Sequence, residues 1–265
     1  MKLAAVLGDP IEHSRSPALH GHWLARHGID GTYVPLRVTP ERLEAALRLL
    51  PEIGFAGCNV TIPHKEAALA LAHEATDRAR RVGAANTLVF EEGRIRADNT
   101  DGVGFLANLR QRSGWIADRP AVVLGAGGAA RGIVAALVDA GVPEIRVANR
   151  TAARAKALAG AFPRCVAQGW PGALADAGLL VNTTSLGMAG QPALEVDLGP
   201  LPRNAAVADI VYAPLETDLL RRAAARGHPV VDGLGMLLHQ AVPGFEAWFG
   251  ERPEVDDALR AAVLG

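Results

Sequence analysis

The stretch "AVVLGAGGAARGIVAALVDAG", residues 121–141, decides the fold class of this 265-residue chain. It begins with four apolar residues suited to a buried strand, passes through a glycine-rich turn and continues as an alanine-rich helix. Gly125, Gly127 and Ala130 have the G-x-G-x-x-G/A spacing of a dinucleotide site. Between a strand and a helix, such a turn lets backbone N–H groups meet a pyrophosphate. A plain tight turn is the alternative interpretation.

Similar apolar runs follow this stretch along the chain. Each is nearly continuous in apolar character and rich in β-branched residues, as expected of strands covered on both faces of a parallel sheet. The runs are "EIRVANR" (144–150), "LLVNTTS" (179–185), "AVADIVY" (206–212) and "PVVDG" (229–233). Strands that alternate with helices predict βαβ units, so we expect a Rossmann-like domain here.

The N-terminal part shows the same alternation in shorter pieces, and two runs around "EEG" (91–93) have the chemistry of a β-hairpin with Gly93 at its turn. We therefore predict an α/β protein of two domains, in which a mixed, mainly parallel sheet accompanies the Rossmann-like one. The strand-like runs are 3–8, 32–38 and 57–62, and the helix-like segments are 16–28, 40–50 and the stretch from about 64 onward.

The composition is that of an ordinary globular protein. Hydrophobic residues make up 49% and charged residues 21%, and a net charge of -1 gives no electrostatic argument for nucleic acid or an anionic membrane as partner. Cys58 and Cys165 are too few for a disulfide framework. We see no signal peptide and no apolar run near the ~18 residues of a membrane span. We therefore expect a cytoplasmic protein.

The end of the run at 144–150 bears on the choice of cofactor. An NAD site needs an acidic residue there for the ribose 2′-hydroxyl, but this chain has Asn149, Arg150 and Thr151, with Arg154 four residues beyond Arg150. Arginines at i and i+4 lie on one helix face and can form charge-assisted bonds to a 2′-phosphate. The sequence thus favours NADP, against the alternative of ordinary surface arginines at a helix start.

Lys65 stands in an unfavourable place for a cation. A helix is expected to begin at about His64, so this lysine lies in a first turn, where the helix dipole disfavours a positive charge by about 0.3–1 kcal/mol. Other polar residues lie near the strand ends of the same half. They are Ser14, Ser16, Asn59, Thr61, Asn86 and Asp101. Helix capping explains one of the two serines but not the other, and each Asn, Asp or Thr alone is an ordinary turn residue.

Together with Gln240, these residues resemble the shikimate dehydrogenase family along essentially the whole chain. The resemblance implies reversible, NADP-dependent reduction of the 3-keto group of 3-dehydroshikimate to shikimate. It also implies a substrate domain of residues 1–101, to which residues 237–265 return, and a cofactor domain of residues 102–236. The motifs that carry it, in the family's order, are "HSRSP", "NVTIPHKE", "GAANT", "NTDG", "GAGGA", "NRT", "DIVYAP" and "GMLLHQ".

The resemblance also implies the residues of the site. Ser14 and Ser16 would hold the substrate carboxylate, which Tyr212 would approach from the cofactor domain. Around the ring hydroxyls would lie Asn59, Thr61, Lys65, Asn86, Asp101 and Gln240. Beside the cofactor would lie Gly125, Ala126, Gly127, Gly128, Ala129, Asn149, Arg150, Thr151, Arg154, Thr183, Ser185, Met188, Val211, Gly233 and Met236. No metal is expected, since His13, His64 and His239 have no recognisable metal-ligand spacing.

Lys65 and Asp101 would act as the acid–base pair. The helix dipole favours a neutral lysine, whereas a nearby carboxylate favours the charged form. A lysine that both donates a proton and stabilises an oxyanion needs such tuning. The alternative is an exposed lysine beside Glu66.

Two other functions stay open on the sequence. One is a quinate/shikimate dehydrogenase with broader substrate or NAD use, which Arg150 and Arg154 disfavour and Ser14 disfavours weakly. The other is a non-catalytic NADP-binding sensor, which would have no chemical need for both Lys65 and Asp101. The C-terminal helices could form a homodimer face or pack on the first domain.

Overall fold

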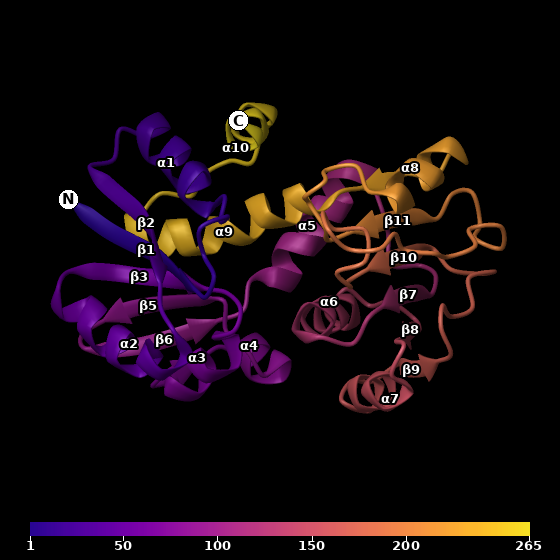
Figure 1. Ribbon diagram of the computed structural model, residues 1–265, viewed down its shortest axis with the longest axis horizontal. Coiled ribbons are helices and arrows are strands. Elements are labelled where there is room, and N and C mark those ends of the chain that lie inside the picture. The colour runs from indigo at the N-terminus through magenta and orange to yellow at the C-terminus, as the bar shows by residue number, and fades with distance from the viewer. The chain divides into compact units, whose positions relative to one another are not determined.

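The computed structural model describes all residues from 1 to 265, and they form two compact units (Figure 1). Unit 1 comprises Met1–Thr100 and Leu238–Gly265, and unit 2 comprises Asp101–Leu237. Each unit is built on a six-stranded sheet with helices packed against it, so the expected α/β class is confirmed. None of the helices is both long and apolar enough to cross a membrane.

Unit 1 contains a mixed sheet of strand order β2-β1-β3-β5-β6-β4. The first three strands of this order are parallel, β5 runs antiparallel to β3 and β6, and β4 is parallel to β6. The elements are β1 (Lys2–Gly8), α1 (Ser16–Arg26), β2 (Gly31–Arg37), η1 (Pro40–Arg42), α2 (Leu43–Glu52), β3 (Phe55–Val60), α3 (Lys65–Leu71), β4 (Glu74–Ala75), α4 (Asp77–Val82), β5 (Thr87–Glu91), β6 (Arg94–Asp98), α10 (Asp257–Leu264) and the part of α9 (Gly233–Phe249) from Leu238 onward.

Side chains that alternate along the strands divide the core of unit 1 into two layers. On one face, Leu43 and Leu47 of α2 pack with buried strand residues such as Leu7. On the other face the core is aromatic, with the Trp23 and Phe245 rings 5.2 Å apart. Figure 1 shows the corresponding arrangement, with α2 and α3 below the sheet of unit 1 and α1 above it.

Unit 2 contains an all-parallel sheet of order β9-β8-β7-β10-β11-β12. Counted within the unit this is the 3-2-1-4-5-6 order of a dinucleotide-binding fold, which confirms the Rossmann-like prediction. The elements are α5 (Asp101–Ser113), β7 (Ala121–Leu124), α6 (Gly128–Asp139), β8 (Ile145–Ala148), α7 (Ala152–Gly160), β9 (Cys165–Gln168), β10 (Leu179–Asn182), β11 (Ala206–Asp209), α8 (Asp218–Ala225), β12 (Val230–Val231) and the first residues of α9.

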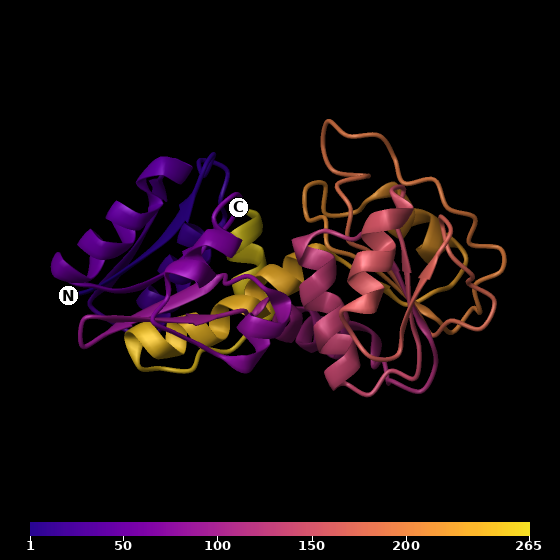
Figure 2. The same cartoon turned by 90° about the horizontal axis from the view of Figure 1, so that it is seen from below.

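Both faces of this sheet are covered. The central strands β7, β8, β10 and β11 are buried along their whole length, as their continuous apolar runs predict. Figure 2 shows α6 and α7 together on one face. On the other face, Leu219 and Leu220 of α8 pack with residues of the long connection after β10, among them Leu194 and Val196.

Local details agree with the predictions in some places and differ in others. The β5–β6 hairpin forms as predicted, with φ of 51° at Glu92 and 73° at Gly93, which is the left-handed pair that a two-residue turn favours. The helix predicted over 40–50 is instead a 3₁₀ turn followed by α2. Thr151 is the N-cap of α7, so Arg150 precedes the helix, and the expected i, i+4 helical relation to Arg154 is wrong.

Candidate active site

The candidate substrate residues of unit 1 lie along the edge of the sheet that is formed by the ends of its strands, and not beside an outer strand. The parallel strands β1 and β3 end there, and β5 begins there because it runs antiparallel, with Thr87 opposite Asn59. Backbone hydrogen bonds join the loops at this edge. The Thr61 N–H donates to the Leu7 carbonyl oxygen (2.9 Å), and the Asp9 N–H donates to the Ile62 carbonyl oxygen (3.1 Å). The topology therefore gathers residues from far-apart parts of the sequence.

Asn86 is the centre of a buried polar cluster at this edge. Its side chain is 3% exposed, and its Nδ2 donates to Thr100 Oγ1 (3.0 Å) and to Gln240 Oε1 (3.1 Å). Its Oδ1 accepts from the Thr100 N–H (2.9 Å) and from Thr87 Oγ1 (3.0 Å). Thr100 Oγ1 also bonds the Gln240 carbonyl oxygen (2.8 Å). The structure thus brings the predicted residues Asn86 and Gln240 into direct contact.

Asn59 extends this cluster into the aromatic layer. Its Nδ2 donates to the Asn86 carbonyl oxygen (3.0 Å) and to Thr87 Oγ1 (3.2 Å), and its Oδ1 accepts from the Tyr33 hydroxyl (2.6 Å). The Tyr33 ring stacks on His20, with centroids 3.9 Å apart. Burial lowers the pKa of His20 to about 3, so this imidazole stays neutral beneath the cluster.

The two candidate serines lie where the loop after β1 enters α1. Ser16 is the first residue of the helix and is buried, and Ser14 is half-buried just before it. The N-cap residue is Arg15, whose side chain makes no capping bond. Ser14 Oγ instead accepts from the Ser16 N–H (3.3 Å). Neither serine is therefore the N-cap residue itself, and helix capping accounts for Ser14 only in part.

Lys65 is the first residue of α3, directly after the N-cap His64. The His64 imidazole is buried and its Nε2 lies 2.6 Å from the Val38 carbonyl oxygen, so it has a packing role. The Lys65 carbonyl oxygen accepts from the Ala85 N–H (2.8 Å), which ties the start of α3 to the segment before Asn86. Asp101, 8% exposed, begins α5 directly after Thr100.

In unit 2, the glycine-rich turn after β7 is open at the start of α6. Gly125 has φ of +112°, and a Cβ there would meet Thr183 Oγ1 at 2.5 Å, so only glycine suits this position. At Gly127 and Gly128 a Cβ would meet nothing within 4 Å. The N-cap Gly127 offers no side chain, so the first N–H groups of a 12-residue helix have no side-chain cap. Ala126 and Ala129 are half-buried in the same turn.

The end of β8 presents a cationic, exposed segment. Arg150, Thr151 and Arg154 are exposed, and neither arginine takes part in an ion pair. Asn149 Nδ2 donates to the Thr151 carbonyl oxygen (3.0 Å) and so shapes the start of α7. No acidic side chain follows β8 where an NAD site would need one.

The remaining candidates lie in loops that follow β10, β11 and β12. Thr183 Oγ1 donates to the Leu124 carbonyl oxygen (2.7 Å), which joins the loop after β10 to the end of β7. Ala189 donates to Ala213 (2.9 Å), which joins the loops after β10 and β11. Of the other candidates, Ser185 and Met188 are exposed, Tyr212 and Met236 are half-buried, and Val211 and Gly233 are buried.

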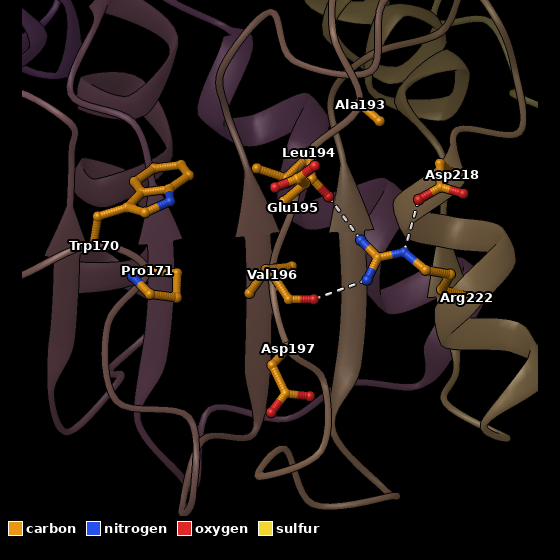
Figure 3. Close-up of a pocket in the computed structure, with 9 residues that line it drawn as sticks. All are labelled: Trp170, Pro171, Ala193, Leu194, Glu195, Val196, Asp197, Asp218 and Arg222. Atoms are coloured by element: carbon orange, nitrogen blue, oxygen red, sulfur yellow. Dashed lines mark hydrogen bonds and ion pairs between the residues drawn. The ribbon is translucent and has the colours of Figure 1, made fainter.

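A pocket of about 670 Å³ lies elsewhere on unit 2 (Figure 3). Trp170 and Pro171, which follow β9, form one side, and Asp218 and Arg222 of α8 form the other. Arg222 donates to the carbonyl oxygens of Leu194 (2.7 Å) and Val196 (2.8 Å). Its guanidinium is therefore used to hold the long connection that follows β10. No predicted site residue lines this pocket.

Sequence reasoning missed the residues that support the candidates from behind, namely Tyr33, Thr100, Asn182 and Asp209. Asp209 is 2% exposed, and burial raises the pKa of its carboxyl to about 6 although Val211, Thr217 and Asn182 all donate to it. The signal was visible: an acid ends the otherwise apolar run "AVAD" of "AVADIVY". No group of three or more His, Cys, Asp or Glu side chains could hold a metal ion.

Three family models match this chain. The shikimate dehydrogenase substrate binding domain matches residues 6–88, the shikimate / quinate 5-dehydrogenase model matches residues 108–175, and the shikimate 5′-dehydrogenase C-terminal domain matches residues 233–263.

Individual proteins match along the whole chain. A relative from Rhodospirillum rubrum named shikimate dehydrogenase (NADP(+)) is 62% identical over 276 residues, which covers 100% of this chain and 97% of the relative. The crystal structure of shikimate 5-dehydrogenase from Thermus thermophilus in complex with NADP(H) and shikimate is 40% identical, with a TM-score of 0.92 and coverage of 100% and 99%. Quinate dehydrogenase from Corynebacterium glutamicum in complex with NAD is 31% identical, with the same TM-score and coverage.

Proposed function

The chain belongs to the shikimate dehydrogenase family, and from this premise we propose that it catalyses the reversible reduction of 3-dehydroshikimate to shikimate with NADPH. The observation that carries the proposal is the 62% identity over the whole chain to a relative named for this activity with NADP. The enzyme is then an NADP-dependent oxidoreductase that acts on a CH–OH group in the biosynthesis of aromatic amino acids.

Unit 1 and the first residue of α5 would supply the substrate contacts. Ser14 and Ser16 would donate hydroxyl hydrogen bonds to the carboxylate at the start of α1, where the helix dipole also favours a negative charge. Asn86 and Gln240, already bonded to each other, would receive ring hydroxyls together with Asn59 and Thr61. Tyr212 of unit 2 would complete the carboxylate contacts. A rigid amide cluster suits this task because its groups are held in place before the substrate arrives.

Lys65 and Asp101 would carry the proton. In the reductive direction an alkoxide develops on the substrate oxygen, and the Lys65 ammonium would stabilise it and donate a proton to it. In the oxidative direction the neutral amine would take the proton back. The Asp101 carboxylate would favour the charged lysine against the dipole of α3, at whose first turn Lys65 lies.

Unit 2 fits NADP as a bound cofactor. The uncapped N–H groups of Gly127, Gly128 and Ala129 suit the pyrophosphate, and the exposed, unpaired Arg150 and Arg154 suit a 2′-phosphate, with Asn149 and Thr151 beside them. When bound, the cofactor supplies or accepts the hydride. Its nicotinamide end would lie between the loops after β10 and β11 and the start of α9. The residues proposed there are Thr183, Ser185, Met188, Val211, Gly233 and Met236. Gly125 and Ala126, in the same turn as Gly127, would let the backbone approach the pyrophosphate closely.

The test is a spectrophotometric assay of the wild type with shikimate and quinate, each with NADP and NAD. We expect kcat/KM to be highest for shikimate with NADP. A preference for quinate or NAD would favour the related activity of the 31%-identical quinate dehydrogenase, whose fold is as similar. NADP binding without turnover of either substrate would favour a sensor.

The same assay with Arg150→Ala tests the origin of the cofactor preference. Two charge-assisted bonds, each worth about 1.5–3 kcal/mol and weakened by solvent at this exposed site, give an expected preference for NADP of about 10²–10³ in kcat/KM. Arg150→Ala should erase most of it by weakening NADP and should leave NAD nearly unchanged. Equal damage with both cofactors would show that Arg150 does not read the phosphate.

Location and assembly are also proposals. Cys58 and Cys165 are both unpaired, as suits a reducing compartment, and we propose the cytoplasm. Homodimerisation stays a prediction that light scattering on the purified chain would decide.

A further inference from the structure

Asn182 and Asp209 face each other at the carboxyl ends of β10 and β11. The two residues are partners in the parallel register, and the Asn182 Nδ2 donates to Asp209 Oδ1 (3.0 Å). Asn182 is 0% exposed and Asp209 is 2% exposed. Neither is among the residues proposed above to touch the substrate or the cofactor, although each stands in a motif next to proposed cofactor residues.

Asn182 uses its amide to shape the loop that follows β10. Its Oδ1 accepts from the Thr184 N–H (3.0 Å) and from Thr184 Oγ1 (2.7 Å), and its Nδ2 also donates to the Leu186 carbonyl oxygen (3.1 Å). Thr184 Oγ1 in turn accepts from the Leu186 N–H (3.1 Å). These bonds fix the backbone on both sides of Ser185 and directly after Thr183.

Asp209 does the same for the loop that follows β11. Its Oδ1 accepts from the Val211 N–H (3.0 Å), and its Oδ2 accepts from Thr217 Oγ1 (2.8 Å). Thr217 is the N-cap of α8, so one carboxyl holds both ends of the segment that contains Tyr212. Through Asn182 the same carboxyl is joined to the loop after β10.

The carboxyl is an expensive group to bury in this place. All three donors to it are uncharged, and burial raises its pKa above the ordinary value despite them. If the last residue of β11 served only to pack against α8, an amide or an apolar side chain could be buried there at a lower free-energy cost than the carboxyl of Asp209. A costly polar group directly behind functional loops is a sign of a functional constraint.

We propose that Asp209 is a positioning residue: together with Asn182 it sets the loops 183–188 and 211–217 at a fixed spacing, and thereby places the nicotinamide end of the cofactor and Tyr212. This rests on the proposed function, since the loops are assigned to the cofactor there. Asp209 does not touch substrate or cofactor and acts through the backbone of its neighbours.

The test compares three variants of the full chain with the wild type. Asp209→Ala removes all three bonds, and we expect kcat for shikimate oxidation to fall about 10- to 100-fold and KM for NADP to rise, because small displacements of positioned groups are costly. Asp209→Asn keeps one acceptor for Asn182 and Val211 and turns its NH₂ towards Thr217 Oγ1. It should retain kcat within about 3-fold.

Thr217→Val is the matched control. It removes the N-cap of α8 and one bond to Asp209 but leaves the bonds to Asn182 and Val211. It should lower Tm and should reduce kcat less than Asp209→Ala does, because two of the three bonds to Asp209 remain. An unchanged kcat in Asp209→Ala would overturn the proposal, as would a loss in Thr217→Val equal to that in Asp209→Ala. A loss in Asp209→Asn as large as in Asp209→Ala would also overturn it, since charge and not position would then matter.

Two further measurements keep the result interpretable. If Asp209→Ala does not fold, Asn182→Ala tests the same Asn182–Asp209 pair from β10. The expected fall in kcat and rise in KM for NADP are the same. Calorimetric titration with NADP needs no turnover, so weaker binding to Asp209→Ala would support the positioning role even if the wild type failed to oxidise shikimate. The proposed activity and the positioning role can therefore fail separately.

Discussion

The carboxyl edge of the sheet in unit 1 presents side chains, whereas the corresponding edge in unit 2 presents mostly backbone. In unit 1 the candidate groups are hydroxyls, amides and one lysine, all buried or half-buried, and three of them, Asn59, Asn86 and Gln240, belong to one hydrogen-bonded cluster. In unit 2 the central candidates are the N–H groups of an open glycine turn. A substrate with several hydroxyls is recognised group by group, but a pyrophosphate needs only converging N–H donors.

The difference determines how each site can be damaged. A side-chain group can be deleted one at a time, with an effect on one ligand. A backbone donor is deleted only by proline, which also fixes the local backbone, so displacement by an added side chain is the milder test.

Lys65→Ala should lower kcat by about 10²–10⁴, the usual range for a positioned acid–base group. KM for shikimate should change much less, because the hydroxyl and amide partners survive. Steady-state kinetics of the variant should be compared with Lys156→Ala, which removes an exposed lysine from α7 and should have no effect. A Lys65→Ala enzyme with half the wild-type turnover would exclude the role proposed for this residue.

Ser14→Ala and Ser16→Ala should each raise KM for shikimate about 10- to 150-fold, because each loses a bond to a charged group worth about 1.5–3 kcal/mol. KM for NADP should hardly move, since the proposed NADP residues belong to unit 2. The matched control is Ser113→Ala, whose hydroxyl bonds only the Leu109 carbonyl oxygen within α5. If Ser14→Ala lowered Tm but left both KM values unchanged, its bond to the Ser16 N–H would be its real contribution.

Gly125→Ala tests the backbone-built site. Its φ of +112° would strain alanine, and the new Cβ would meet Thr183 Oγ1 at 2.5 Å. We expect a loss of about 1–3 kcal/mol in the free energy of unfolding and a rise in KM for NADP of about 10-fold. Gly141→Ala is the control, since φ there is +89° with nothing within 4 Å of the Cβ. It should share the strain but not the change in KM, and equal KM values in the two variants would contradict our interpretation.

The fold was predictable where a local pattern decides the structure. The step from β7 through Gly125 into α6 combines a buried run, a turn that needs glycine and a helix, so it could be read without tertiary knowledge. The two-residue β4 was not, because it exists only through pairing with β6. The edge strand β9 alternates too little in polarity to stand out in the sequence.

The supporting residues escaped prediction for a related reason. Asn182 and Asp209 are 27 residues apart in the chain, and only the register of β10 against β11 makes them partners. Tyr33 and Asn59 meet in the same way, across the face of the sheet in unit 1. Periodicity shows which face of a strand is buried, but it cannot show which strand lies beside it. The expected roles of Lys65, Asp101 and the serines came from family resemblance and stay predictions.

The smallest expected effect concerns the one acid in these buried networks. In unit 1 the polar cluster is uncharged, and the adjacent His20 has a pKa lowered to about 3 by burial. In unit 2, burial raises the pKa of Asp209 from 3.8 to about 6. The folded state therefore binds this proton more tightly than the unfolded state does. The contribution to stability is complete below about pH 3.8 and is lost as the pH rises through 6.

Other acids, such as Asp98 and Asp256, have lowered pKa values and oppose this trend, so the wild-type profile alone cannot isolate Asp209. The difference between the wild type and Asp209→Asn does isolate it, because the amide does not titrate. The measurement is urea unfolding of both proteins. The free energy of unfolding of the wild type, minus that of the variant, should increase by about 2 kcal/mol when the pH is lowered from 7.5 to 4.5. A difference that stays constant over this range would mean that Asp209 titrates alike in the folded and unfolded states. The contrast between a neutral network in unit 1 and a titrating one in unit 2 would then be wrong.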